Sequence, residues 1–272
     1  MNIFQTIILG VIQGLTEFLP VSSSGHLVLF QHIFGLTEAE LLFDISVHLG
    51  TLVAVFIFFR QDIYSMIVSI VRYCRQALKT GSFSPANDDT GLKLALMIIT
   101  GSVPTAIIGL LFHKIADRLF SSLLIAGSML ILTGIILFFT QFVKNSKKDD
   151  SLFSLKDSLI IGISQGLAIM PGLSRSGATI GTGLFLGLSH ETAAKFSFLL
   201  SIPAILGATI LSFADIERNG TVSANASMAG AFAACVTGYF ALRFLFYIVK
   251  KGRLHYFSPY CLIIGIISLM LS

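Results

Sequence analysis

Two short segments of the chain hold side chains suited to hydrolytic chemistry. The first, TEFLPVSSSGH, brings Glu17, Ser23 and His26 close together in the sequence. A hydroxyl nucleophile, an imidazole that moves protons, and a carboxylate that orients the imidazole or binds a metal together suit nucleophilic catalysis. Because Ser23 and His26 are three positions apart, a helical turn would place both on one face. The segment is therefore a candidate catalytic site.

The second segment, PGLSRSGAT, places one arginine among serines and glycines. In both segments a serine-rich turn precedes an apolar helix, so the serines stand where helix N-caps belong. The free N–H groups and the dipole at such a helix end attract anions. Two such ends around an arginine would bind a diphosphate. The residues of this expected pocket are Ser22, Ser24, Gly25, Ser174, Arg175, Ser176, Gly177 and, one helical turn before Glu17, Gln13.

Each of these residues also has a purely structural interpretation. The serines can simply cap helices and pack closely. Glu17 and Arg175 can form a structural ion pair, and His26 can be a hydrogen-bonded packing residue. The two charges are the hardest to explain by packing, because a charge at the middle of a membrane costs at least about 2.5–3.5 kcal/mol.

The composition identifies the surroundings of both segments as a membrane. Of the 272 residues, 54% are hydrophobic and only 12% are charged, whereas a soluble domain has about 25% charged residues. A soluble domain of this size cannot bury so much apolar surface. The net charge of +4 is too small and too dispersed to indicate nucleic acid binding. We therefore expect an all-α polytopic membrane protein.

Six stretches are long enough to span about 30 Å of hydrocarbon, and polar interruptions separate them. The longest interruptions run over residues 61–90 and 144–157, and the second is the expected linker between two halves. The six expected spans are residues 43–59, 92–112, 123–143, 193–213, 228–249 and 256–271.

The segments at residues 3–34 and 158–188 are apolar but broken by Pro, Gly and Ser. They match each other at one constant offset, which indicates an internal duplication. The matching pairs are Gly10/Gly162, Gln13/Gln165, Gly14/Gly166, Leu15/Leu167, Ser22/Ser174, Ser24/Ser176 and Gly25/Gly177. At this offset Ser23 corresponds to Arg175. The two segments therefore share their glycines and serines, but the first has a reactive residue where the second has a phosphate-binding one.

Each copy is one broken, re-entrant helix pair followed by three spanning helices. Three crossings place the second copy upside down, so we expect two inverted-topology repeats in one membrane domain. Repeat 1 covers residues 1–145 and repeat 2 covers residues 158–272. Non-helical backbone inside a membrane must line a cavity, which applies to residues 20–25 and 171–177.

The distribution of basic residues predicts the orientation. Most of the 18 Lys and Arg residues fall on one face of this arrangement, which is then cytoplasmic. The first broken segment and both termini then open to the outer side. Asp44 and His48, four positions apart on one helical face, either join the cavity or form a structural polar pair, and the pair is the favoured interpretation.

The two segments and a third stretch of the chain resemble a known protein family. QGLTEFLPVSSSGH at 13–26 and PGLSRSGAT at 171–179 are similar to the two signatures of the bacterial undecaprenyl-diphosphatase family of the bacitracin-resistance type. FDISVHLGTLVAVFIFFR at 43–60 resembles a third marked stretch of that family. The resemblance implies an inner-membrane phosphatase that converts the C55 polyprenyl diphosphate lipid to the monophosphate, with its site open to the periplasmic side. This reaction recycles the lipid carrier of cell-wall synthesis.

The resemblance also implies roles for individual residues. The family's acidic motif falls on Gln13 and Glu17, its nucleophile on Ser23, its histidine on His26 and its phosphate-binding arginine on Arg175. Glu17 with phosphate oxygens and water would hold Mg²⁺ or Ca²⁺, which prefer oxygen ligands. Ser23, His26 and an activated water all remain candidate nucleophiles. The partners implied are the lipid substrate and membrane lipid, and a homodimer is compatible with the resemblance.

A transporter or flippase for a polyprenyl phosphate lipid is the alternative function. Inverted repeats with broken helices are typical of secondary transporters, and a flippase would need the same anion pocket. A carrier, however, needs no nucleophile and no base. Ser23 and His26 therefore favour the enzyme.

Overall fold

The structure is a computed structural model that describes residues 1–27, 41–80, 89–113, 119, 122–143, 153–214 and 223–271. Every secondary-structure element in this described part is a helix, which confirms the all-α prediction. The first half contains α1 (Ile3–Phe18), α3 (Leu41–Phe58), α4 (Arg60–Thr80), α5 (Thr90–His113), α7 (Leu123–Phe139) and the 3₁₀ turn η1 (Thr140–Phe142). The second half contains α8 (Leu155–Leu167), α9 (Arg175–Phe185), α10 (His190–Ala214), α11 (Ala224–Lys250), η2 (Leu254–Phe257) and α12 (Ser258–Met270).

Four helices of the described chain, α5, α7, α10 and α11, are long and apolar enough to cross a membrane. They coincide with four of the six predicted spans. The other two predictions fall on α3 and α12; α12 is shorter, and α3 is followed by α4 across a bend of 78°. The polar interruption expected over residues 61–90 thus contains a long helix, α4. In the expected linker, residues 144–152 lie outside the described residues, and α8 already begins at Leu155.

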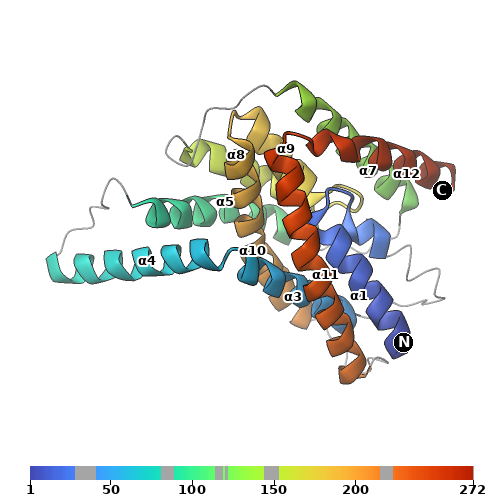
Figure 1. Ribbon diagram of the computed structural model, residues 1–272, viewed down its shortest axis with the longest axis horizontal. Coiled ribbons are helices and arrows are strands. Elements are labelled where there is room, and N and C mark those ends of the chain that lie inside the picture. Colours follow the sequence, from blue (N-terminus) through green and yellow to red (C-terminus); the bar gives the residue numbers. More distant parts are fainter. Residues whose placement is uncertain are drawn as a thin grey trace.

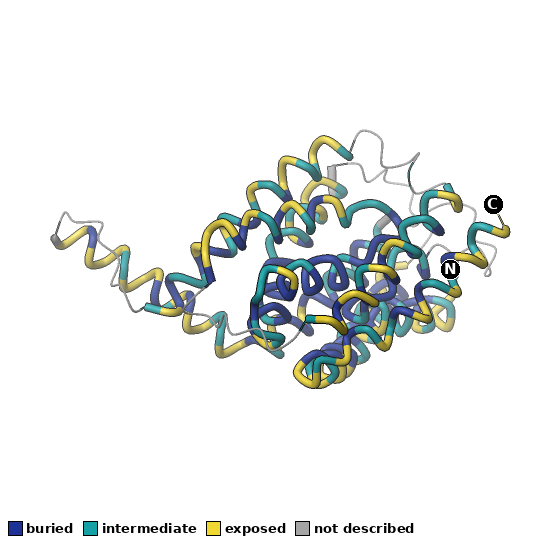
Figure 2. Tube along the Cα trace, turned by 90° about the horizontal axis from the view of Figure 1, so that it is seen from above, coloured by how far each residue is buried: buried dark blue, intermediate teal, exposed yellow. Residues whose placement is uncertain are grey.

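The outer surface of the helices carries large apolar side chains, as a lipid environment requires. Leu111 on α5, Leu124 on α7 and Phe232 on α11 are between 59% and 72% exposed. Figure 2 shows such exposed residues along the outer sides of the helices, with the buried residues facing inward. In water this much exposed apolar surface would cause aggregation. These features identify a multi-pass membrane protein.

Helical geometry is interrupted at both predicted breaks. α1 ends at Phe18, where the extended Leu19 (φ −61°, ψ 141°) precedes Pro20, and residues 23–27 are helical again. Residues 28–34 of the predicted broken segment lie outside the described residues. In the second half, the chain leaves α8 at Leu167 and re-enters a helix at Arg175. Between them, Gly172 takes a φ of +89° that favours glycine.

Glycines allow the broken segments to approach helices of the opposite half. α1 lies beside α11 (Figure 1), and a Cβ on Gly10 would overlap the carbonyl oxygen of Gly230. α8 packs on α5 in the same way, with Gly162 against the carbonyl of Gly101. Such small-residue contacts are the usual means of close helix packing in membranes. They fix where each break lies in the fold.

We expect Gly10→Ala and Gly162→Ala to lower thermal stability, because each methyl group would push two backbones apart. Overpacking of this kind costs about 1–3 kcal/mol. Gly207→Ala is the matched control: it is also helical, and nothing lies within 4 Å of its added Cβ. There the better helix propensity of alanine should leave stability unchanged or raise it. Thermal unfolding of the purified variants in detergent measures the difference, and equal melting of all three would contradict it.

Candidate active site

Glu17, on the last turn of α1, is the centre of a buried polar cluster between the two breaks. Its side chain is 4% exposed. The Glu17 Oε2 atom accepts a hydrogen bond from Gln13 Nε2 at 2.8 Å and another from Ser23 Oγ at 2.7 Å. Gln13 reaches it because the two residues are four positions apart on one helical face. Glu17, expected to be paired or functional, has partners on both of its oxygens.

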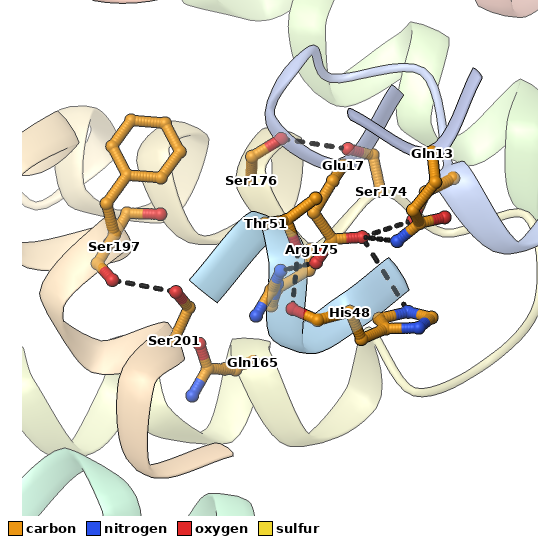
Figure 3. Close-up of polar contacts among 12 residues, drawn as sticks. Gln13, Glu17, His48, Thr51, Gln165, Ser174, Arg175, Ser176, Ser197 and Ser201 are labelled. Carbon is orange, nitrogen blue, oxygen red and sulfur yellow. Dashed lines mark hydrogen bonds and ion pairs between the residues drawn. The ribbon is translucent and has the colours of Figure 1, made fainter. Parts of the chain in front are cut away.

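The other oxygen, Glu17 Oε1, accepts from the guanidinium of Arg175 (Figure 3). Arg175 is the first residue of α9, and the hydroxyl of Ser174 caps that helix by accepting from the amide of Gly177 at 3.2 Å. A Cβ on Gly177 would lie 3.2 Å from Cβ of Pro20. The two breaks, one from each half of the chain, therefore face each other directly.

His48 on α3 lies beside Glu17, as one of its two sequence-based interpretations expects. Its Nε2 lies 3.9 Å from Glu17 Oε2, and its Nδ1 lies 2.7 Å from the main-chain oxygen of Asp44. The sequence favours a structural pair with Asp44; the ring does contact the main chain of Asp44, and it also reaches into the cluster (Figure 3). The signal was present in the sequence, since a polar side chain in an apolar span is functional by default.

The structure does not bring Ser23 and His26 together as a nucleophile and its base. His26 Nδ1 lies 2.9 Å from the carbonyl oxygen of Ser22, and its Nε2 lies 2.5 Å from the hydroxyl of Tyr260. The hydroxyl of Ser23 donates to Glu17 instead. The three-residue spacing fits a helical turn, but the carbonyl of Ser22 and the hydroxyl of Tyr260 determine where the imidazole points.

Tyr260 on α12 is a site residue that sequence reasoning missed. Its ring stacks on His26, with the ring centroids 5.8 Å apart and the planes 13° apart. It is far from both motifs in the sequence, and an aromatic residue near the end of a membrane helix is normally an interfacial anchor. Only the three-dimensional packing of α12 shows its position.

The serines form one hydroxyl pair at each break. Ser22 Oγ and Ser24 Oγ are 3.3 Å apart, and Ser174 Oγ and Ser176 Oγ are 3.2 Å apart. Ser22 has a φ of +68°, a left-handed conformation that is costly for a residue with a side chain. Gly25 lies in the helical turn that follows. Both predicted pairs of serines thus form the same hydroxyl contact near the cluster, although the backbone of Ser174 is extended (φ −69°) and that of Ser22 is left-handed.

The oxygen atoms of the cluster suit a hard cation better than a thiophilic metal. Gln13 Oε1 is buried without a hydrogen-bond partner, one turn from Glu17. Carboxylate and carboxamide oxygens are ligands of Mg²⁺ and Ca²⁺. In the part of the chain that the structure describes, no group of three or more His, Cys, Asp and Glu side chains lies close enough to hold a metal ion.

The fold and the cluster define a class: a polytopic membrane protein in which two broken helices bring a hydroxyl, a carboxylate and a guanidinium together. Comparison with known proteins gives the family. Residues 6–267 match the family of the bacitracin resistance protein BacA, and the chain belongs to that family.

Individual relatives are similar over their whole lengths. The undecaprenyl-diphosphatase of Desulfosudis oleivorans is 50% identical over 274 residues, which cover 100% of this chain and 99% of the relative. The undecaprenyl-diphosphatase of Desulforapulum autotrophicum is 48% identical, with 99% and 98% covered. That of Carboxydothermus hydrogenoformans is 47% identical, with 100% and 98% covered.

We expect a double-mutant cycle on Glu17→Gln and Arg175→Leu to show strong coupling in unfolding free energy. Removing one member of a buried pair leaves the other charge uncompensated, which costs about 3–5 kcal/mol, whereas removing both is much less harmful. Lys250→Gln with Glu191→Gln is the control, because that pair, with 2.9 Å between Nζ and Oε1, is about half exposed. Its coupling should be about 0–1 kcal/mol. Equal coupling in both cycles, measured by denaturation in detergent, would mean that the Glu17–Arg175 contact carries no special stability.

Proposed function

We propose that this protein hydrolyses undecaprenyl diphosphate, a C55 polyprenyl diphosphate, to the monophosphate and inorganic phosphate. The observation that carries the proposal is the hydrogen bond from the hydroxyl of Ser23 to the carboxylate of Glu17. That carboxylate also forms an ion pair with Arg175. Family membership and the names of the relatives support it. Such an activity recycles the lipid carrier of cell-wall synthesis and confers bacitracin resistance.

Ser23 is the proposed nucleophile and Glu17 its proton acceptor. The Ser23 oxygen forms a bond to the distal phosphorus while the bond from that phosphorus to the bridging oxygen breaks. The proton of Ser23 passes to Glu17 and from there to the leaving phosphate of the lipid. Water then releases inorganic phosphate from the phosphoserine. The 2.7 Å contact between the two side chains supports this assignment.

Arg175 and the start of α9 are the proposed phosphate-binding side. A planar guanidinium binds phosphate through two parallel hydrogen bonds, and the N–H groups at the helix start add further donors. In this proposal Arg175 shifts from Glu17 to the substrate, which frees the carboxylate to take the proton of Ser23. Arg175 is close enough to serve both partners because it lies directly at the junction of the breaks.

The two histidines have separate proposed roles. His48, with Nε2 3.9 Å from Glu17 Oε2, helps to orient the carboxylate. His26, held between Ser22 and Tyr260, fixes the turn that presents Ser23. This assignment makes His26 a positioning residue rather than the base of Ser23.

A divalent cation, Mg²⁺ or Ca²⁺, is a further proposal based on the family resemblance. Glu17 and the unpartnered Gln13 Oε1 would hold it together with phosphate oxygens. When bound, the cation would neutralise phosphate charge. Chelation should then lower phosphate release without unfolding the protein.

The two halves are proposed to be inverted repeats, residues 1–145 and 158–272, joined by a linker that starts at residue 144 and ends before α8. Two observations support this arrangement. Gly10 and Gly162 stand at matching positions, and each packs against a glycine carbonyl of the opposite half. The hydroxyl pairs at the two breaks also match. The homodimer stays a prediction.

Transport of a polyprenyl phosphate lipid is the weaker candidate. A flippase needs an anion pocket, and the Arg175 side of the site would provide one. It does not need a hydroxyl hydrogen-bonded to a buried carboxylate, as Ser23 is to Glu17. The contact between Ser23 and Glu17 has a role in phosphate transfer and none in lipid transport.

We expect Ser23→Ala to lower phosphate release from a polyprenyl diphosphate by several orders of magnitude, as loss of an attacking group commonly does. Ser24→Ala is the matched control, since that hydroxyl bonds only to Ser22 among the contacts described, and it should keep a measurable fraction of the activity. The assay uses the purified protein in detergent and measures released phosphate. Similar activity in both variants would favour attack by His26 or by an activated water.

We expect the site to open on the outer side of the bacterial cytoplasmic membrane, because the basic residues concentrate on the other side. Single cysteines at the two ends of α11 test this orientation in a cysteine-free background. Asn225→Cys should react with an impermeant thiol reagent in intact cells, and Lys251→Cys should not; both positions are exposed. The reverse labelling pattern would invert the proposed topology.

A further inference from the structure

α4 differs from every other long helix described. It carries charged side chains along its length, among them Arg72, Arg75 and Lys79, and by itself it is not among the helices apolar enough to span a membrane. It follows α3 after one residue at a bend of 78°. If α3 crosses the membrane, α4 runs nearly parallel to the membrane plane. Figure 1 shows α5 beside α4 and the far end of α4 extending from the rest of the molecule as an arm.

One side of this arm is an uncovered apolar stripe. Its residues follow the three- and four-residue spacing of a single helical face. Ile67 is 55% exposed, Val71 43% and Leu78 87%. Two further members, Ile70 and Cys74, are also exposed. An apolar stripe of this length needs an apolar environment.

Basic side chains adjoin the stripe. Arg72, Arg75 and Lys79 share the neighbouring helical face, and all three are exposed. The polar side of α4 borders a cavity of about 580 Å³ beside the start of α5, lined by hydroxyl-bearing residues together with Arg72 and Gln76. A helix with an apolar face and a Lys/Arg-rich polar face is the kind that lies in the boundary between lipid headgroups and acyl chains.

The middle of α4 is fixed to the start of α5. Ser69 Oγ donates to Asp89 Oδ1 at 2.6 Å, and Arg72 Nη1 lies 3.8 Å from Asp89 Oδ2. The hydroxyl of Ser69 and the amide of Leu92 hold the pKa of Asp89 below its ordinary value, so its carboxylate keeps its charge. These contacts set the direction of α4 relative to α5, and the apolar stripe begins beside them.

We propose that α4 is an interfacial helix whose stripe Ile67, Ile70, Val71, Cys74 and Leu78 inserts at the headgroup boundary, with Arg75 and Lys79 binding the phosphates of anionic phospholipids. Lipid is the proposed partner because the protein is embedded in a bilayer and the basic residues flank the stripe. Anionic lipids are concentrated in the cytoplasmic leaflet, the side to which the basic loops assign this arm. The inference does not depend on the proposed catalytic activity.

The test uses the full-length protein in phosphatidylcholine vesicles, with a polarity-sensitive dye on the native Cys74. Cys235→Ala removes the half-buried cysteine, and Cys261 is 0% exposed and stays in place. Spin-labelled phosphatidylcholine, with its nitroxide near the headgroup, should quench this dye at least twofold more than a dye at Gln76→Cys in a Cys74→Ala background. Position 76 is exposed on the polar face. Equal quenching at both positions would overturn the proposal, and a protein partner would then be the better explanation of the stripe.

Headgroup preference is measured by replacing the quencher with spin-labelled phosphatidylglycerol. The anionic quencher should act more strongly at Cys74, and the double variant Arg75→Gln, Lys79→Gln should lose this preference by several-fold, since each basic residue near the surface contributes about 1 kcal/mol, or about fivefold. The control Lys156→Gln, Lys251→Gln removes two exposed charges away from α4 and should keep the preference. Equal quenching by both lipids in the unmodified protein would overturn the assignment of Arg75 and Lys79.

Discussion

A single charge pair held inside a membrane protein determines the rest of this structure. Neither Glu17 nor Arg175 is tolerable alone in hydrocarbon, and they come from opposite halves of the chain, so the two broken helices must meet for either half to be stable. The pair also brings the proposed nucleophile and the proposed phosphate-binding residues together at the site. Glu17 belongs to the segment with the hydroxyl, and Arg175 belongs to the segment with the helix N-terminus.

The glycine contacts make that meeting possible. Packing without Cβ atoms at Gly10 and Gly162 lets each broken helix lie directly on the backbone of a helix from the other half. Larger residues would hold these helices apart by about the width of a methyl group. Such a separation would strain the direct contact between the guanidinium and the carboxylate. The charge pair between Glu17 and Arg175 therefore depends on the close packing that Gly10 and Gly162 allow.

The sequence predicted the elements well and their mutual contacts less well. Hydropathy located the spans, because lipid requires long apolar stretches, and proline and glycine located both breaks. Glu17, Ser23 and Arg175 could be singled out because charges and serines are conspicuous in an apolar chain. Tyr260 and the pointing of His26 could not be predicted, since they depend on how α12 packs, which no local pattern encodes. Hydropathy alone indicates a polar connection over α4, because the apolar residues of this helix occupy only one face.

The left-handed conformation of Ser22 means that the turn at residues 22–26 would not keep its shape outside this protein. A φ of +68° costs an L-residue about 1–2 kcal/mol, and the neighbours that offset this cost include a tyrosine on the last helix, acting through His26. The same sequence in a short peptide, or grafted onto another helix pair, would relax to an ordinary turn. The shape of this loop is a property of the assembled protein, so the motif alone is not sufficient to build the site.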